Sequence, residues 1–284
     1  MRSHFVKSFL LAITTLFAVH ITYHFVQFAI LYIMDFRPLE LYFQTTWFEP
    51  SLDPRAWSKK RILAVYGGST IAMFVLGITA KVFTPSSVVE VQDKGRIYET
   101  IYSWVFLWSM TYALADVFAA PFIKNATHVA NLQNVYLWYF QGGAIESIAY
   151  VIALVGIPFV IFIPMTALRA FLGTTEFPQD LVFWAGRVNV LLNAVILPGL
   201  LAHGIIIGLL YAIPKYTLDD LIAFEMFRLI TSAGMFLSFF LLSGLNRSGI
   251  KNKDYALVNL STAAVSLITL AVIFGILVLG IQIS

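Results

Sequence analysis

The sequence predicts an all-α fold, a polytopic bundle of about seven transmembrane helices. Mean hydropathy is +0.84, and 60% of the residues are hydrophobic whereas only 12% are charged. Apolar stretches recur along the whole chain, and each is long enough to cross a bilayer, which takes about 20 residues. Because no connection between them has room for a soluble domain of about 50 residues, we expect residues 1–284 to form a single integral membrane domain.

The expected spans are the apolar stretches that lie between charged loops. The first follows Arg2 and Lys7 and is too long for a signal peptide, so we expect it to be retained as a helix. The expected spans are 8–33, 62–83, 98–121, 145–169, 187–212, 221–244 and 256–282.

Two of the connections predict structure of their own. The stretch LELYFQTTWF, after the first span, is rich in aromatic and β-prone residues and predicts an interfacial strand or a re-entrant segment. The segment NATHVANLQNVYLWYFQGG, after the third span, is polar and then aromatic. It predicts an interfacial helix that ends at Gly142 and Gly143.

Composition and charge limit the chemistry and the partners. The chain has no cysteine, which excludes disulfides, iron–sulfur clusters and thiolate zinc sites. No basic run is typical of nucleic-acid binding, so we expect the partners to be the lipid bilayer and other membrane protein subunits, with no nucleic acid. The bias of loop Lys and Arg favours a cytoplasmic N-terminus, and we expect a bacterial inner (cytoplasmic) membrane.

Polar residues inside the first span are functional candidates, because hydrocarbon makes such residues costly. His20, Tyr23, His24 and Gln27 share one helix face. The spacing of His20 and His24, four residues apart, is the one by which a helix supplies two imidazoles to one metal. Either the pair binds a metal or haem, or each histidine bonds a carbonyl or hydroxyl of a neighbouring helix.

The fifth span carries a second polar group around a proline. Asn189, Asn193 and His203 point in directions within about 80° of one another around an ideal helix. Pro198 bends this helix by removing one backbone hydrogen bond. One interpretation makes His203 a third metal ligand. The other is a proline kink whose freed carbonyl is satisfied by an asparagine.

The third and sixth spans contain the remaining charged candidates. Tyr112 and Asp116 share a face with Ser109, and Asp116 is either an interfacial carboxylate bonded to local hydroxyls or a metal ligand or proton carrier. Glu225 and Arg228 are three residues apart on one helix, which predicts an ion pair in which they neutralise each other.

Two of these stretches resemble the site-2-protease-like intramembrane zinc metalloproteases. In that family one helix carries H-E-x-x-H, whose histidines bind zinc and whose glutamate activates water. A later helix carries Asn, then Pro, then the Asp-Gly that supplies the third ligand. Here VHITYHF has His20 and His24 at that spacing, and LNAVILPGLLAHG has Asn193, Pro198 and His203 in the family's order.

The motif departs from the family at its catalytic position. Ile21 stands where the glutamate belongs, so the general base for hydrolysis is missing. His203 likewise replaces the family's aspartate. The resemblance therefore implies a relative that has lost peptidase activity and keeps or lacks its metal, and we expect no catalytic residues.

Three functions remain open from the sequence. The first is a non-catalytic membrane scaffold, pseudoprotease-like or a complex subunit. The second is a metal- or haem-binding protein whose zinc or haem is held by His20, His24, His203 and Asp116, which requires the first and fifth spans to be in contact. The third is a transporter or proton-pathway protein that uses Asp116, Glu225 and the histidines as carriers.

Overall fold

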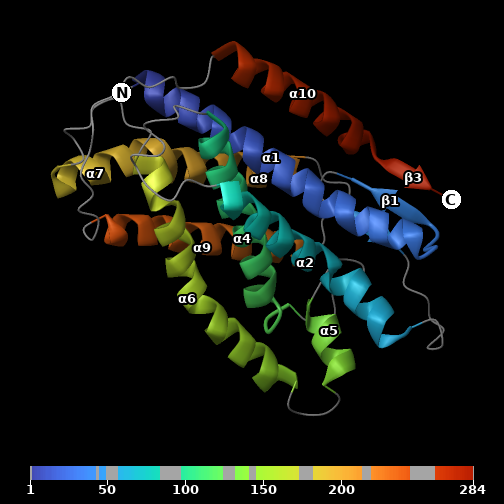
Figure 1. The fold of residues 1–284 in the computed structure, drawn as a ribbon. Helices are drawn as coiled ribbons and strands as arrows, with labels where there is room; N and C mark the ends of the chain where they lie inside the picture. Colours follow the sequence, from blue (N-terminus) through green and yellow to red (C-terminus); the bar gives the residue numbers. More distant parts are fainter. Residues whose placement is uncertain are drawn as a thin grey trace.

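The computed structural model shows a bundle of helices packed side by side (Figure 1). It describes residues 2–42, 45–48, 57–83, 97–123, 132–140, 145–172, 182–212, 219–243 and 260–283. The helical elements are α1 (Arg2–Ile33), α2 (Lys59–Phe83), α4 (Ile97–Ala119), α5 (Leu132–Tyr139), α6 (Ile145–Leu172), α7 (Trp184–Leu191), the π-helical turn η3 (Leu192–Ile196), α8 (Leu197–Ala212), α9 (Asp219–Leu242) and α10 (Leu260–Leu279).

Within the described residues, five helical stretches are long and apolar enough to cross a membrane. They coincide with five of the seven expected spans. Helices α4 and α10 lie at the other two expected positions and are not among the five. This composition fits an integral membrane protein. The five stretches are Phe5–Ile33, Lys59–Phe83, Ser147–Leu172, Trp184–Ala212 and Ala223–Leu242.

Helix α4 lies at the centre of the bundle, in contact with α1, α2, α6 and α9. Its Trp104 and Trp108 side chains are fully buried and stack with their ring centroids 5.3 Å apart. The Trp108 Nε1–H also donates to the carbonyl of Ala12 in α1, at 3.1 Å. Because neighbouring helices shield α4, its buried polar side chains, which include Ser103, Ser109 and Asp116, face protein. The interior of a bundle is where intramembrane polar groups are tolerated.

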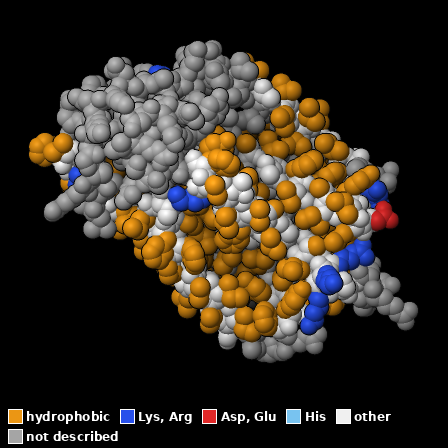
Figure 2. Space-filling view, in the orientation of Figure 1, with side chains coloured by type: hydrophobic (Ala, Val, Ile, Leu, Met, Phe, Trp, Pro, Cys, Tyr) orange, Lys and Arg blue, Asp and Glu red, His pale blue; other side chains and the backbone are white. Residues whose placement is uncertain are grey.

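Helix α6 shows the opposite pattern and lies at the periphery. Val151, Leu154 and Val155 each expose more than half of their surface, at 58%, 63% and 61%. Apolar side chains also cover much of the described face seen in Figure 2, and a group of Lys and Arg side chains lies at its lower right edge. Large exposed apolar surfaces of this kind are expected where a helix faces acyl chains.

A small antiparallel sheet is the part of the fold that an all-α prediction leaves out. Strands β1 (Leu39–Leu41) and β2 (Thr46–Phe48) form inside LELYFQTTWF, where β-prone residues indicated a strand. Strand β3 (Ile281–Ile283) pairs with the other edge of β1. The last helix was expected to continue to residue 282. It ends at Leu279 because Gly280 adopts φ +82°, a left-handed conformation that suits glycine.

The sheet fixes the relative direction of the first and last helices. Helix α10 packs against α1, and the strands that follow these two helices, β3 and β1, are hydrogen-bonded to each other. The C-terminal ends of α1 and α10 therefore lie at the same end of the bundle, and α1 begins at the opposite end (Figure 1).

The segment expected to form an interfacial helix contains α5, which packs against α2 and α6. The Tyr139 hydroxyl donates to the carbonyl of Lys59 at 3.2 Å, where α2 begins. Burial raises the pKa of the Tyr136 phenol. The predicted end at Gly142 and Gly143 lies outside the described residues.

Candidate functional site

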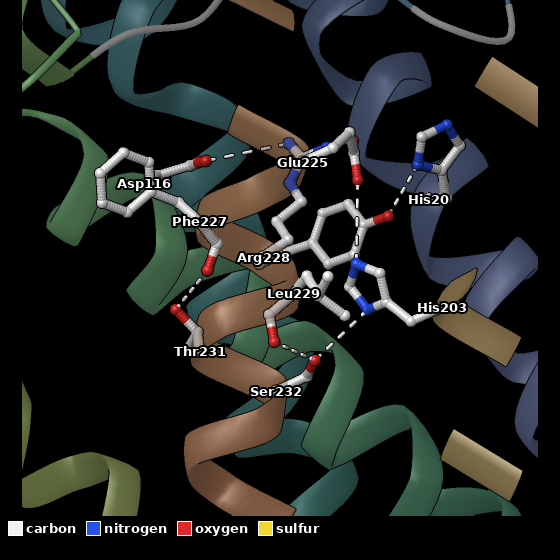
Figure 3. Close-up of polar contacts among 10 residues, drawn as sticks. His20, Asp116, His203, Glu225, Phe227, Arg228, Leu229, Thr231 and Ser232 are labelled. Carbon is white, nitrogen blue, oxygen red and sulfur yellow. Dashed lines mark hydrogen bonds and ion pairs between the residues drawn. The ribbon is translucent and has the colours of Figure 1, made fainter. Parts of the chain in front are cut away.

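The polar residues that the sequence places in separate spans meet in one buried cluster between α1, α2, α4, α8 and α9 (Figure 3). No member exposes more than 6% of its surface. We name it the Arg228 cluster, and it consists of His20, Tyr23, Thr70, Tyr112, Asp116, His203, Glu225, Arg228 and Ser232.

Arg228 lies at the centre of this cluster. Its guanidinium carbon is 4.6 Å from the ring centroid of Tyr23 and 4.1 Å from that of Tyr112, which places the cation against two aromatic faces. The Nη1 atom bonds Glu225 Oε1, one turn earlier on α9. The Nη2 atom lies 3.8 Å from Asp116 Oδ1 on α4. The buried cation is thus compensated by carboxylates and π-electrons, as a charge inside a membrane requires.

Asp116 is bound by hydroxyls from two other helices. Its Oδ2 atom accepts hydrogen bonds from the Tyr23 hydroxyl of α1 at 2.8 Å and from Thr70 Oγ1 of α2 at 2.6 Å. The side chain is 2% exposed. It is therefore a buried carboxylate that joins three helices, and the hydroxyls it binds come from neighbouring helices and not from its own.

Glu225 and His203 face each other across a gap. Glu225 Oε2 lies 3.9 Å from His203 Nε2, and neither atom has a hydrogen-bond partner among the described residues. The other ring nitrogen of His203, Nδ1, is 3.5 Å from Ser232 Oγ on α9. A separation of 3.9 Å is too long for a direct hydrogen bond. A small shift of either side chain, or a water molecule between the two atoms, would complete the contact.

The formal charges of the cluster do not balance. Asp116 and Glu225 supply two carboxylates, whereas Arg228 supplies one guanidinium. With neutral histidines, the described cluster carries one negative charge in excess. An uncompensated charge removed from water costs several kcal/mol or more, and such groups usually neutralise by taking up a proton.

The polar face of α1 extends from this cluster along the helix. The hydroxyl of Tyr112 lies 2.7 Å from His20 Nδ1, so the His20 side chain is directed at α4. The rings of His20 and His24 are 4.8 Å apart, nearly perpendicular. Neither ring nitrogen of His24 has a hydrogen-bond partner among the described residues, and the same holds for Gln27 Nε2.

Two of the three histidines that were expected to share a metal, His20 and His203, have different polar neighbours. Helices α1 and α8 are in contact, as a shared site requires. However, His20 bonds Tyr112, and His203 faces Glu225 and Ser232. In the part of the chain that the structure describes, no group of three or more His, Asp and Glu side chains is arranged to hold a metal ion. Zinc or haem binding by His20, His24, His203 and Asp116 stays a prediction.

The fifth span departs from an ideal helix in the turn η3. There the backbone N–H of Leu197 bonds the carbonyl of Leu192, five residues earlier. This wider turn changes the angular relation between residues before and after it, so an ideal-helix argument cannot place Asn193 on the same face as His203. The Asn193 Nδ2 atom instead donates to the backbone carbonyl of Asn189 at 2.8 Å and to its Oδ1 at 3.1 Å. Pro198 removes the donor for a carbonyl four residues before it and not for that of Asn189, so the kink interpretation stays a prediction.

One hydrogen-bond donor in the cluster was missed by the sequence analysis. Thr70 lies in the GGST stretch of α2, where small residues are usually interpreted as helix-packing positions. Its hydroxyl nevertheless makes the shorter of the two hydrogen bonds to Asp116. A threonine in an apolar span normally bonds its own helix, so its sequence position alone did not distinguish it.

Comparisons with known proteins do not assign this site. No family model, no curated protein and no solved structure matches the chain. The resemblance to site-2-protease-like metalloproteases stays a prediction, and the function has to be argued from the cluster itself.

Proposed function

We propose that this protein carries protons through its helix bundle and that the Arg228 cluster is its proton-binding site. The observation that supports this function is the charge imbalance of the cluster, together with the two facing atoms, Glu225 Oε2 and His203 Nε2, that have no other described partner. Ionisable residues that face the interior of a membrane bundle commonly belong to proton relays or transport pathways.

One proton on the Glu225–His203 pair balances the cluster. If His203 holds it, the imidazolium donates from Nε2 to Glu225 and from Nδ1 to Ser232, whose oxygen is already 3.5 Å away. If Glu225 holds it, the carboxylic acid donates to neutral His203. In both cases the positive and negative charges are equal. The proton therefore belongs to the pair, as in other strongly coupled sites.

Arg228 makes this site able to release its proton. Its bond to Glu225 Oε1 stabilises the ionised carboxylate, and the Asp116 carboxylate and the two tyrosine rings hold the guanidinium in place. A carboxyl group in hydrocarbon with no cation nearby would keep its proton. A proton-carrying site needs both states to be accessible, and the guanidinium lowers the cost of the ionised one.

The proposal includes seven spans, because α4 supplies Asp116 to the cluster and α10 runs parallel to α1. An odd number of spans places the two chain ends on opposite sides of the membrane. We propose a bacterial inner membrane with the N-terminus cytoplasmic.

Proton uptake into proteoliposomes tests the function. Purified protein is reconstituted into vesicles that enclose a pH-sensitive dye, and a potassium diffusion potential, negative inside, drives protons inward. We expect vesicles with wild-type protein to acidify, and vesicles with Glu225→Gln to acidify no faster than protein-free vesicles. In this variant the charges of Asp116 and Arg228 balance each other, so the cluster has no need of an additional proton.

The matched control is Thr231→Val. Thr231 lies on the same helix as Glu225, but its hydroxyl donates to the carbonyl of Phe227 in its own helix and to no cluster residue that is described. This variant should acidify the vesicles as fast as wild type. Equal acidification by Glu225→Gln and wild type would refute the proposal.

A non-catalytic scaffold or complex subunit is the second candidate function. This function is favoured by the way the cluster joins helices. The single side chain of Arg228, for example, contacts side chains of α1, α4 and its own helix. A purely structural cluster would leave vesicle acidification at background in wild type and in Glu225→Gln, while the substitution lowers thermal stability.

A further inference from the structure

We propose that the polar face of α1 is the route by which protons reach the Arg228 cluster, with His24 as the relay nearest the sheet. The inference rests on the proposed function and specifies the side of the bundle from which the site is reached. It assigns a role to His20, His24 and Gln27. These three residues take no part in binding the proton at Glu225 and His203.

The inner end of the route is a direct hydrogen bond. The His20 Nδ1 atom and the Tyr112 hydroxyl are 2.7 Å apart, and the Tyr112 ring lies against the Arg228 guanidinium, which bonds Glu225. His20 is thus one hydroxyl away from the charged centre. Figure 3 shows His20 directed towards this centre from α1.

The middle of the route is His24, one turn closer to the sheet. Its ring centroid is 4.8 Å from that of His20, and the side chain is 5% exposed. Both of its ring nitrogens have no partner among the described residues, which is costly for a buried imidazole. Buried polar atoms of this kind are normally satisfied by ordered water, so we place a water-filled passage beside His24.

The outer end of the route continues in the same direction. Gln27 follows His24 by three residues on the same face of α1, is 1% exposed, and its Nε2 atom has no described partner. The Thr46 hydroxyl, where β2 begins, donates to the backbone carbonyl of His24 at 2.8 Å. The row of unpaired polar atoms therefore runs towards the end of the bundle that the sheet covers.

Proton transfer along this route balances without any other reactant. A proton arriving from water converts His24 to its imidazolium, which passes a proton through water to His20. His20 then gives its Nδ1 proton to the Tyr112 oxygen while the Tyr112 hydroxyl proton passes through water to the Glu225–His203 pair. One proton enters and one is bound, and each relay group returns to its neutral form.

The proposed route requires His24 to hold its proton only briefly, and burial of its ring disfavours a charged imidazole. The groups that act electrostatically on His24 are His20 on the same helix and Arg228 from α9, and the ring also contacts Tyr23. The Arg228 cation and a protonated His20 both repel a positive His24. A group that holds a proton only briefly passes it on, which is the property that a relay needs.

Two measurements on His24→Asn separate the route from the site. In the vesicle assay we expect acidification about 100-fold slower than in wild type, the lower range of what a positioned proton-transfer group contributes. In a pH-jump titration of the purified protein, the number of protons bound at equilibrium should equal that of wild type, because the Glu225–His203 pair is intact. Glu225→Gln, in contrast, should lose the bound proton itself.

The matched control is Thr22→Val, which lies between the two histidines on α1 and whose hydroxyl donates to the carbonyl of Ala18 in its own helix, at 2.6 Å. It should acidify the vesicles at the wild-type rate. Gln27→Leu gives a second, independent test of the route, and it too should slow acidification without changing the number of bound protons.

The outcomes distinguish failure of the route from failure of the function. Wild-type rates in both His24→Asn and Gln27→Leu, with Glu225→Gln inactive, would overturn the route and leave the proposed function standing. Wild-type vesicles that acidify no faster than protein-free ones would overturn both proposals.

Discussion

Replacing Arg228 with Met tests how much the buried ion pairs of the cluster contribute to the free energy of unfolding. The substitution keeps much of the side-chain length but leaves Glu225 without the bond to its Oε1 and Asp116 without the cation 3.8 Å away. Removal of one partner from a buried ion pair costs about 3–5 kcal/mol. Loss of the cation from two desolvated aromatic faces adds about 2 kcal/mol. We expect Arg228→Met to lower the free energy of unfolding by about 5 kcal/mol, since protonation of the carboxylates offsets part of the total.

The double variant Glu225→Gln with Arg228→Met should be milder than the single one. It leaves no unpaired charge at position 225, and coupling energies of contacting residues are typically about 0.5–3 kcal/mol. We expect the double variant to recover about 2 kcal/mol of the loss. Thr231→Val, which removes a bond within its own helix, should change stability by less than about 1 kcal/mol.

Thermal unfolding in detergent micelles measures these differences. A loss of 1 kcal/mol lowers the midpoint by about 2 °C in a chain of this size. Arg228→Met should therefore unfold about 10 °C below wild type and the double variant about 6 °C below it. Equal midpoints for the single and the double variant would refute the reasoning, because they would show that the two residues are not coupled.

Three further predictions concern the surroundings of the cluster. Asp116→Ala leaves two buried hydroxyls without an acceptor and should cost about 2–4 kcal/mol in thermal unfolding, whereas Asp116→Asn should cost less because its amide oxygen still accepts. Gly199→Ala should lower stability by about 1–3 kcal/mol, since its added Cβ would run into an aromatic ring of α9, and Gly204→Ala, which meets nothing within 4 Å, should be neutral or stabilising. Single cysteines at Ile281 and at Arg37 should be labelled from the same side of the membrane, because β3 pairs with β1; labelling from opposite sides would contradict the orientation of α10.

The sequence predicted those parts of the site that depend on spacing within one helix. Positions 20 and 24 lie on one face of α1, and the three-residue spacing of Glu225 and Arg228 places them in contact. Regular helix geometry is sufficient for both results. The composition likewise predicted helices at the positions where the structure has them.

The remaining contacts depend on how helices pack, which the spacing along one chain does not encode. The contact between Arg228 and Asp116 joins helices far apart in sequence. The π turn η3 invalidated the ideal-helix placement of Asn193. Strand β3 was included in an apolar span because its residues are as hydrophobic as those of α10, and only Gly280 marks the boundary.

The number of protons that the cluster binds tests the central claim most directly. A pH-jump titration of purified wild-type protein and Glu225→Gln, at equal concentration in the same detergent, measures the difference in protons taken up while both remain folded. We predict that wild type binds one proton more than Glu225→Gln, because the variant has one carboxylate and one guanidinium and needs no proton for balance. Identical titration curves for the two proteins would contradict the account.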